Sequence, residues 1–466
     1  MTAHERPWAP ATVSTVGAAA AVVVASGSHG NRLDPHVQRY AGRASSMTAS
    51  EIRALFSVAS RPEVVSLAGG MPNLAALPMD DVADLIHGII STRGASALQY
   101  GSGQGDPTLR EQILDVVSLV GISCHPDDVI VTTGSQHALD LVARIFLDPG
   151  DTVLAEGPSY VGALSTFNSY QAKVDHVPMD AHGLIPQALR ERLAELIAAG
   201  RPPKFLYTVP SFHNPMAVTL TAERRAEVLA ICQSAGVLVL EDDPYGLLGF
   251  NGHIPQAIRA LDGDGVVYLG SFSKTFAPGL RVGWAVAPHG VREKLVLAAE
   301  ASVLSPSAFS QLTVSGYLAS FPWFDQIKKY RAVYRERRDA MLTSLDDAAR
   351  SGTLPDGTHW THPDGGFYVW LSLPPGWDAG ALLPRAIAGR VAFVPGRAFY
   401  ADGQGVADMR LSFCFPPPER IREGIRRLCD VIGAEASVRA MFGGSALGQA
   451  SSQGSASTGI PSPDLA

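Results

Sequence analysis

The sequence predicts an α/β protein with a mostly parallel central sheet in a large domain and a second, smaller α+β domain. Between about residues 129 and 286, short apolar runs rich in β-branched residues alternate with longer amphipathic stretches. Each run is too short for a helix, and alternation of strands with helices is typical of a parallel sheet covered on both faces. From about Arg331 onward the pattern changes to a long charged helix, two short strands and a closing helix.

The same patterns predict where the individual strands and helices lie along the chain. Six buried strands of the large domain are predicted over residues 129–131, 152–154, 205–207, 237–240, 266–269 and 284–286. An apolar stripe over residues 138–146 predicts one covering helix, and residues 222–234 predict another with Thr221 as its N-cap. In the smaller domain we expect a helix over 328–348, strands around 366–370 and 409–413, and a closing helix over 418–432.

Composition predicts how the 466 residues are organised, because 46% hydrophobic and 17% charged residues support a large core. We expect a flexible Ala-rich extension over 1–45 and a Gly- and Ser-rich tail over 436–466 that cannot bury enough surface to order itself. Between them we expect an N-terminal segment of the small domain (46–90), the large domain (91–330) and the C-terminal part of the small domain (331–435).

Charge and cysteine usage exclude several classes of protein. The net charge of −7 means that basic residues are not in excess, so the composition gives no indication of nucleic-acid binding. The four cysteines form no Cys-x-x-Cys pair, so we expect neither a disulfide scaffold nor a zinc ribbon, and a reducing, cytoplasmic location is the natural interpretation. The apolar run within residues 16–26 is shorter than the roughly 20 residues that span a bilayer. A long, nearly neutral stretch precedes it, which does not resemble a secretory signal.

Polar residues follow several of the predicted strands, at the sheet edge where ligands bind in open α/β folds. Gly134, Ser135 and Gln136 follow the first strand and open a helix. Glycine allows close backbone approach, and free N–H groups at a helix start favour an anion, so this segment is a candidate phosphate site. An ordinary glycine turn with a serine cap is the alternative.

Two further strand ends carry charged residues. The carboxylates of residues 241–243 follow a buried strand, where a solvated turn and a divalent-metal site are alternatives. No second group of ligands with suitable spacing stands out, so a metal site is disfavoured. Lys274 follows another strand, and a buried lysine loses its charge readily and forms Schiff bases with aldehydes. A surface lysine is the alternative there.

Together these segments supply a phosphate site, an aspartate, a tyrosine, an asparagine, a lysine and an arginine. That set fits pyridoxal 5′-phosphate, an aromatic aldehyde with an anionic phosphate and a basic ring nitrogen.

Three motifs resemble those of the fold-type I pyridoxal-phosphate-dependent aminotransferases of class I/II. They are Ser271-Phe272-Ser273-Lys274, Arg281-Val282-Gly283-Trp284 and Asp242-Asp243-Pro244-Tyr245. The sequence is most similar to the branch that holds 2-aminoadipate and kynurenine aminotransferases and the catalytic domains of MocR-type regulators. The likeness covers about residues 46–433.

This resemblance implies a role for each matching residue. Lys274 would form the internal aldimine with the cofactor, and Asp242, three residues before Tyr245, would pair with the pyridinium nitrogen. Tyr245 and Asn214 would hydrogen-bond the ring oxygen, and Tyr160 would stack on the ring. The phosphate contacts implied are Gly134, Ser135, Gln136, Ser271, Ser273 and Arg281.

For the substrate, the resemblance implies that Arg410 binds the α-carboxylate, since a guanidinium suits that planar anion better than an ammonium does. Gly70, in a segment that passes over the substrate, and Asn214 would also contact it. Tyr100 resembles the tyrosine that reaches the cofactor phosphate of a neighbouring subunit, which implies a homodimer.

The implied activity is transfer of an amino group between an α-amino acid and a 2-oxo acid, with Lys274 as general base and acid and with ping-pong kinetics. One departure leaves an alternative open: residues 214–217 read Asn-Pro-Met-Ala, where the family usually has Asn-Pro-Thr-Gly. This is either drift in a loop or a pocket reshaped for elimination, replacement or carbon–carbon bond formation in specialised metabolism. A pyridoxal-phosphate-binding regulator is a third hypothesis, which predicts an attached DNA-binding domain; no winged-helix segment precedes the body.

Overall fold

The computed structural model describes residue 36, residues 39–47 and residues 61–443. Most of the extension predicted over 1–45, and the tail after residue 443, lie outside the described residues. A short 3-10 helix, η2 (Gly42–Ser46), precedes the body.

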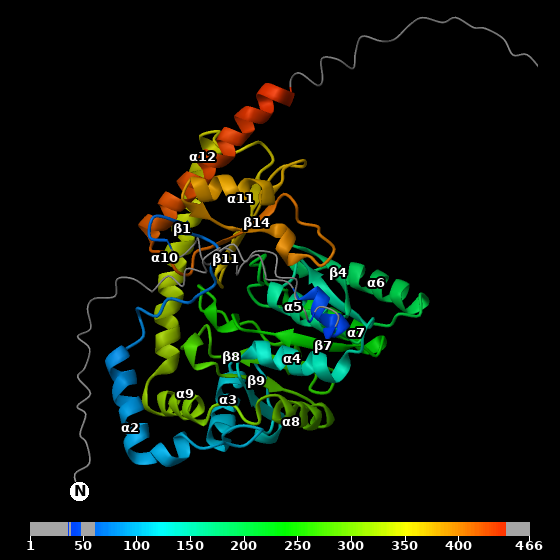
Figure 1. Ribbon diagram of the computed structural model, residues 1–466, viewed down its shortest axis with the longest axis vertical. Helices are drawn as coiled ribbons and strands as arrows, with labels where there is room; N and C mark the ends of the chain where they lie inside the picture. Colours follow the sequence, from blue (N-terminus) through cyan, green and yellow to red (C-terminus); the bar gives the residue numbers. More distant parts are fainter. Residues whose placement is uncertain (1–35, 37–38, 48–60, 444–466) are drawn as a thin grey trace, which may run out of the picture. The chain divides into compact units, whose positions relative to one another are not determined.

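The large domain is built on an eight-stranded sheet with the strand order β2-β9-β8-β7-β6-β3-β4-β5 (Figure 1). Strands β3, β4, β6, β7 and β8 pair in parallel, while β9 is antiparallel to both of its neighbours and β5 is antiparallel at the edge. The prediction of a mostly parallel sheet is therefore confirmed. Its strands are β2 (Val129–Thr132), β3 (Thr152–Gly157), β4 (Lys173–Asp180), β5 (Gly183–Leu184), β6 (Phe205–Thr208), β7 (Leu238–Asp242), β8 (Val266–Ser271) and β9 (Gly283–Val286).

Helices cover both faces of this sheet, as the alternation of strands and helices predicted. Successive residues of a strand pack on opposite faces of the sheet. Val153 of β3 and Leu240 of β7 lie in the hydrophobic cluster that contains α4 and α5, whereas their chain neighbours Leu154 and Val239 lie in the cluster that contains α6 and α7. The large domain contains α3 (Pro107–Ser118), α4 (Ser135–Phe146), α5 (Val161–Ser169), α6 (Pro186–Ala198), α7 (Ala222–Ser234), α8 (His289–Val303) and α9 (Ala308–Ser320).

The smaller domain is an α+β unit, as predicted. Its antiparallel sheet has the order β10-β11-β14-β13, and β1 and β12 form a separate parallel pair. The strands are β1 (Val65–Ser66), β10 (His359–Trp360), β11 (Tyr368–Ser372), β12 (Val391–Ala392), β13 (Val394–Pro395) and β14 (Asp408–Ser412), and the helices are α10 (Trp323–Arg350), α11 (Ala379–Ala388) and α12 (Pro418–Gly443).

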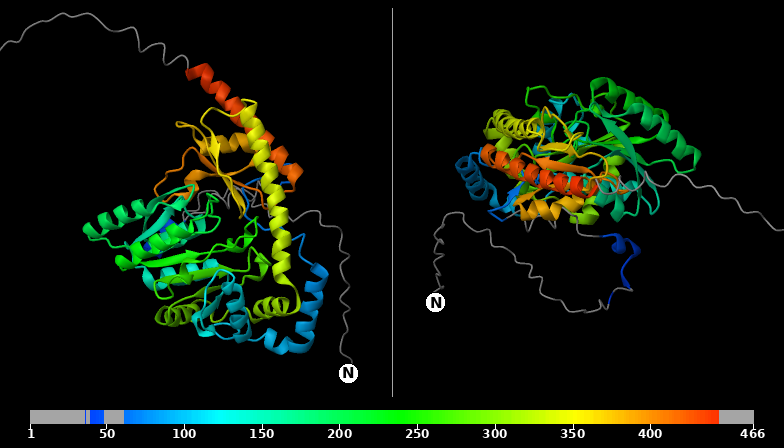
Figure 2. Two further views of the ribbon diagram at one scale, coloured as in Figure 1. Left: turned by 180° about the vertical axis from the view of Figure 1, so that it is seen from behind. Right: turned by 90° about the horizontal axis from the view of Figure 1, so that it is seen from above.

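Two helices of this unit are longer than their predicted bounds. Helix α10 begins at Trp323, directly after Pro322, and runs past the large domain to lie against α12 (Figure 2). Helix α12 continues beyond the predicted end at residue 432 as far as Gly443. Gly433 is followed by Ala434, Glu435 and Ala436, which have high helix propensity, so the single glycine does not end the helix.

The division into domains stays a prediction, because the described residues from Arg43 onward form one compact unit. The boundary expected at residue 90 falls inside α2 (Met79–Ala97), a helix that packs against α9. None of the described helices is both long enough and apolar enough to cross a lipid bilayer.

Candidate active site

A cavity of about 280 Å³ lies at the carboxyl ends of β6, β7 and β8, where it meets the small-domain strands β11 and β14; we call it the Lys274 cavity. Ten of the predicted site residues line it: Gly70, Ser135, Tyr160, Asn214, Asp242, Tyr245, Ser271, Ser273, Lys274 and Arg410. The loops after distant strands therefore bring most of the predicted site together. Gly134, Gln136, Arg281 and Tyr100 do not line the cavity directly.

Lys274 lies in the turn that follows β8, with its ammonium group facing the opposite wall of the cavity. Nζ donates a hydrogen bond to the carbonyl oxygen of Gly70 at 2.8 Å and lies 5.7 Å from the centre of the Phe367 ring. Removal from water lowers the pKa of the Lys274 amine to about 8, and the positive charge of Arg410 acts in the same direction. About a tenth of the amine is thus neutral at pH 7, and the neutral amine is the form that attacks an aldehyde.

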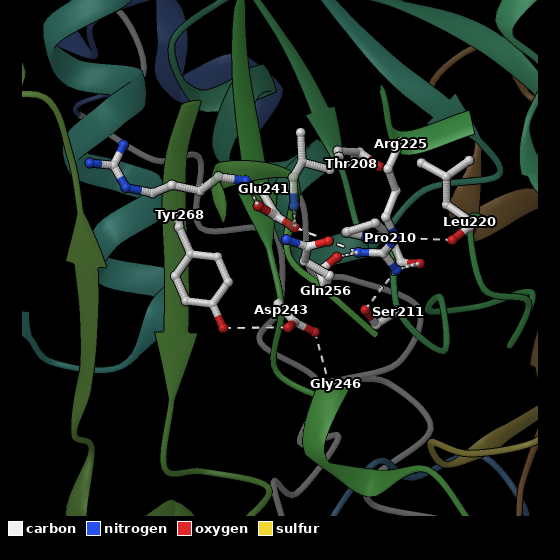
Figure 3. Close-up of polar contacts among 12 residues, drawn as sticks. Thr208, Pro210, Ser211, Leu220, Arg225, Glu241, Asp243, Gly246, Gln256 and Tyr268 are labelled. Atoms are coloured by element: carbon white, nitrogen blue, oxygen red, sulfur yellow. Dashed lines mark hydrogen bonds and ion pairs between the residues drawn. The ribbon is translucent and has the colours of Figure 1, made fainter. Parts of the chain in front are cut away.

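Three consecutive carboxylates end β7, but two of them belong to the scaffold. Glu241 accepts hydrogen bonds from the backbone N–H groups of Ile258 and Arg259 and lies 3.8 Å from the Arg225 guanidinium. Asp243 accepts from the backbone N–H of Gly246 at 2.9 Å and from the Tyr268 hydroxyl. Figure 3 shows both side chains within this buried network.

Asp242, between them, points the other way and lines the cavity. Its Oδ2 accepts a hydrogen bond from the hydroxyl of Tyr207 at 2.9 Å, whereas its buried Oδ1 has no partner. Burial raises the pKa of the Asp242 carboxyl to about 7, and the Tyr207 hydrogen bond opposes that shift. A buried acceptor without a donor is costly, so Oδ1 is suited to a protonated nitrogen that a ligand brings.

The start of α4 forms the anion-binding end of the site. Gly134 has a φ of +81°, and a Cβ there would lie 2.3 Å from Nη2 of Arg281. Arg281 donates to the hydroxyl of Ser273 at 3.2 Å and to the carbonyl oxygen of Thr133 at 3.3 Å. The Ser273 hydroxyl and the start of α4 are thus close to a guanidinium, and Ser135 and Ser271 add hydroxyls to the cavity wall, a combination that favours a phosphate.

At the other end, Arg410 on β14 is buried and held by two hydrogen bonds. Nη1 donates to Oδ1 of Asn214 at 2.9 Å and Nη2 donates to the carbonyl oxygen of Ala68 at 2.8 Å. The guanidinium carbon lies 4.2 Å from the centre of the Tyr368 ring. These contacts fix the plane of the guanidinium, while its Nε has no protein partner.

Three predicted residues stand apart from the cavity in different ways. Gln136 is turned toward α5, where its amide donates to Thr166 and accepts from the Tyr160 hydroxyl. Tyr100 is 77% exposed, and in the described residues it makes no contact with the cavity of its own chain. Arg281 reaches the site only through Ser273 and the backbone next to Gly134.

Sequence reasoning missed the aromatic support of the site. Tyr207 and Tyr368 lie within predicted strands but were not predicted as site residues, and both bring a hydroxyl to the site. Tyr368 also lines the cavity, together with Met71, Val209 and Pro244. Side-chain alternation could have indicated Tyr368, because β11 pairs with β14 and the two strands present Tyr368 and Arg410 on the same face.

The site fits pyridoxal phosphate at three separate points. The Gly134–Arg281 end suits the phosphate, the unpartnered Oδ1 of Asp242 suits the basic ring nitrogen, and the Lys274 amine suits the aldehyde. Met216 and Ala217, which depart from the usual motif, line a different cavity of about 630 Å³ and do not line the Lys274 cavity.

Comparison with known proteins agrees with this geometry. The family model for class I and II aminotransferases matches residues 62–428. The aromatic-amino-acid aminotransferase 1 of Thermococcus litoralis is 39% identical over 399 residues, which cover 85% of this chain and 94% of that protein. The 2-aminoadipate transaminase of Thermus thermophilus is 38% identical, over 82% of this chain and 93% of that protein.

Solved structures give the same result. The Pyrococcus horikoshii kynurenine aminotransferase, crystallised in complex with PMP, superposes with a TM-score of 0.81 and 39% identity over 86% of this chain and 98% of that chain. The predicted branch, fold type, cofactor and amino-transfer activity are confirmed, and elimination or replacement chemistry is not favoured. This chain belongs to the class I and II aminotransferases, the pyridoxal-phosphate-dependent enzymes of fold type I.

Proposed function

We propose that this aminotransferase acts on α-amino acids with an aromatic or other large apolar side chain and passes the amino group to a 2-oxo acid. The observation that carries the proposal is the lining of the Lys274 cavity. Its walls include a methionine, a valine, a proline and three tyrosines, two of which (Tyr160 and Tyr245) we assign to the cofactor. Among the described residues, Lys274 and Arg410 are the only cationic ones that line it. A substrate with a second carboxylate would need a further cation, which the described part of this chain does not bring to the cavity.

The proposed binding mode uses Arg410 for the substrate α-carboxylate. Two hydrogen bonds already fix this guanidinium, so little conformational entropy is lost when a carboxylate binds to it. Because Oδ1 of Asn214 accepts from Arg410, the Asn214 amide N–H group is left to donate toward the cavity.

Pyridoxal phosphate, when bound, supplies an aldehyde that takes up the amino group and a ring that accepts electrons from the substrate α-carbon. We assign the proton transfers at that carbon to Nζ of Lys274, whose pKa of about 8 suits a general base and acid near neutral pH. Asp242 would hold a proton on the ring nitrogen through Oδ1. Tyr160 would stack on the ring and exclude water from it, and the Tyr245 hydroxyl would hydrogen-bond the ring oxygen.

We also propose a homodimer in which Tyr100 reaches the phosphate site of the partner subunit. Its exposure on the described surface and its distance from its own chain's cavity support this role. The cytoplasmic location predicted from cysteine usage stays a prediction.

The test is a substrate panel with the purified holoenzyme and 2-oxoglutarate, in which formation of glutamate is measured. We expect kcat/KM for phenylalanine, tyrosine and kynurenine to exceed the values for aspartate and 2-aminoadipate by about tenfold or more, since a buried charge without a partner costs more than 1.4 kcal/mol. Consumption of amino acids without glutamate would contradict amino transfer. A preference for dicarboxylic substrates would contradict only the side-chain specificity.

A further inference from the structure

A buried carboxylate and a buried imidazole lie next to the Lys274 cavity and take no part in the mechanism described so far. Glu156 is in β3, and His213 immediately precedes Asn214 in the loop after β6. Both side chains are only 1% exposed, and Nε2 of His213 lies 3.1 Å from Oε2 of Glu156. Ionisable groups are rarely buried so completely unless they hold something in place.

Glu156 connects two strands and the loop. Its Oε1 accepts a hydrogen bond from the hydroxyl of Thr208 at 2.9 Å, and its Oε2 accepts from the backbone N–H of Val209 at 2.8 Å. The contact with His213 completes the set, although it is close rather than well aligned as a hydrogen bond. One carboxylate therefore ties the end of β3 to the end of β6 and to the residue before Asn214.

His213 holds the loop from inside. Its Nδ1 accepts a hydrogen bond from the backbone N–H of Met216 at 3.2 Å, and the backbone N–H of His213 donates to the carbonyl oxygen of Val218 at 2.8 Å. A ring nitrogen that accepts carries no proton, so the proton of the neutral imidazole is on Nε2, toward Glu156.

The loop needs such support because its backbone is unfavourable. Phe212 and Ala217 have φ values of +48° and +61°, a left-handed conformation that side chains with a Cβ rarely adopt. These two residues flank His213 and Asn214, and such conformations persist only where the surroundings impose them.

We propose that Glu156 and His213 are positioning residues, which hold Asn214 so that its Oδ1 meets Nη1 of Arg410 at 2.9 Å. The pair acts through Asn214 and sets the orientation of the guanidinium for the substrate carboxylate. The inference rests on the proposed role of Arg410 and adds to it two residues that contact neither substrate nor cofactor.

The experiment measures binding of 3-phenylpropanoate, a carboxylate without an amino group, to the holoenzyme through the change in cofactor absorbance. The variants are Glu156→Gln, His213→Gln and their double variant. Arg410→Lys tests the carboxylate site itself. Leu193→Ala is the matched control, because Leu193 is buried in the α6–α7 cluster and its truncation weakens the fold without touching the cavity.

We expect each single variant to raise the Kd about tenfold, because a hydrogen bond to a charged group typically contributes about that factor to binding. The double variant should raise it no further, because the two residues act as one unit. Leu193→Ala should lower the midpoint of thermal unfolding and leave the Kd unchanged. If the Glu156 variant does not fold, Thr208→Val removes one hydrogen bond to the same carboxylate and should raise the Kd to a smaller extent.

The outcomes separate the two proposals. If Arg410→Lys raises the Kd but the Glu156, His213 and Thr208 variants match Leu193→Ala, the pair is merely structural and this inference is wrong. If Arg410→Lys itself leaves the Kd unchanged, the assigned carboxylate site is wrong and the inference is overturned with it.

Discussion

Among the described residues, the hydroxyl of Tyr207 is the only hydrogen-bond partner of the Asp242 carboxyl, and its removal is the sharpest perturbation of this site. Tyr207→Phe keeps the buried ring and deletes one hydrogen bond of 2.9 Å to Oδ2, while Oδ1 already has no partner. The variant therefore changes the charge state of Asp242 without changing its position. Tyr207 does not itself line the cavity, so every lining residue is unchanged.

The magnitude follows from the environment. A hydrogen bond to a charged group is worth about 1.5–3 kcal/mol, or roughly one to two pKa units. The carboxyl pKa of about 7 includes the lowering by Tyr207, so the variant's pKa should lie clearly above neutrality. A protonated Asp242 stabilises a positive ring nitrogen poorly, and we expect kcat at pH 7 to fall about 10- to 100-fold. Because the carboxylate returns at higher pH, kcat of the variant should rise between about pH 7 and 9.

Tyr268→Phe is the matched control. Tyr268 is also buried, on β8 at the opposite side of β7 from Tyr207, and its hydroxyl donates to Asp243, which does not line the cavity. Steady-state rates and single-turnover cofactor absorbance, each followed across pH, compare the two variants. We expect Tyr268→Phe to lose some stability and little activity. Equal kcat values for the two variants, or a Tyr207→Phe profile parallel to the wild type, would refute the reasoning.

Two further predictions concern the cofactor. The Lys274 amine, with a pKa of about 8, should capture pyridoxal phosphate about tenfold faster at pH 9 than at pH 7 in stopped-flow absorbance, because the free amine is the reactive form; borohydride should then fix the cofactor in the wild type and not in Lys274→Ala. Gly134→Ala, whose Cβ would collide with Arg281, should weaken cofactor binding about tenfold or more. Gly150→Ala, also at positive φ but in open space, should leave the cofactor Kd unchanged, and equal losses in both would contradict the phosphate assignment.

The ends of the central strands could be predicted because buried parallel strands appear in the sequence as short runs of apolar, β-branched residues. The family resemblance, in which the matching acid lies three residues before the tyrosine, distinguished Asp242 from Asp243, and the structure brings Asp242 alone of the three carboxylates to the cavity. β4 was not predicted, because its exposed and polar residues carry little apolar pattern.

Side-chain direction could not be obtained from the sequence. Gln136 sits at the predicted helix start, yet Thr166 on α5 and the Tyr160 hydroxyl hold its amide away from the cavity. Tyr207 reads as an ordinary core residue until packing places its hydroxyl against a carboxylate from the next strand. Such pairings depend on which strands become neighbours, which no local pattern contains.

The hydrogen bond between Arg410 and Ala68 joins residues 342 positions apart in the chain. Closing a loop of that length costs conformational entropy before the contact stabilises the chain, so we expect the complete site to form late in folding. Unfolded chains then have no comparable affinity for the cofactor. We therefore expect pyridoxal phosphate to stabilise the native state by mass action, by about 2.7 kcal/mol at a free concentration one hundred times its Kd, so that more free cofactor leaves less unfolded enzyme open to proteolysis.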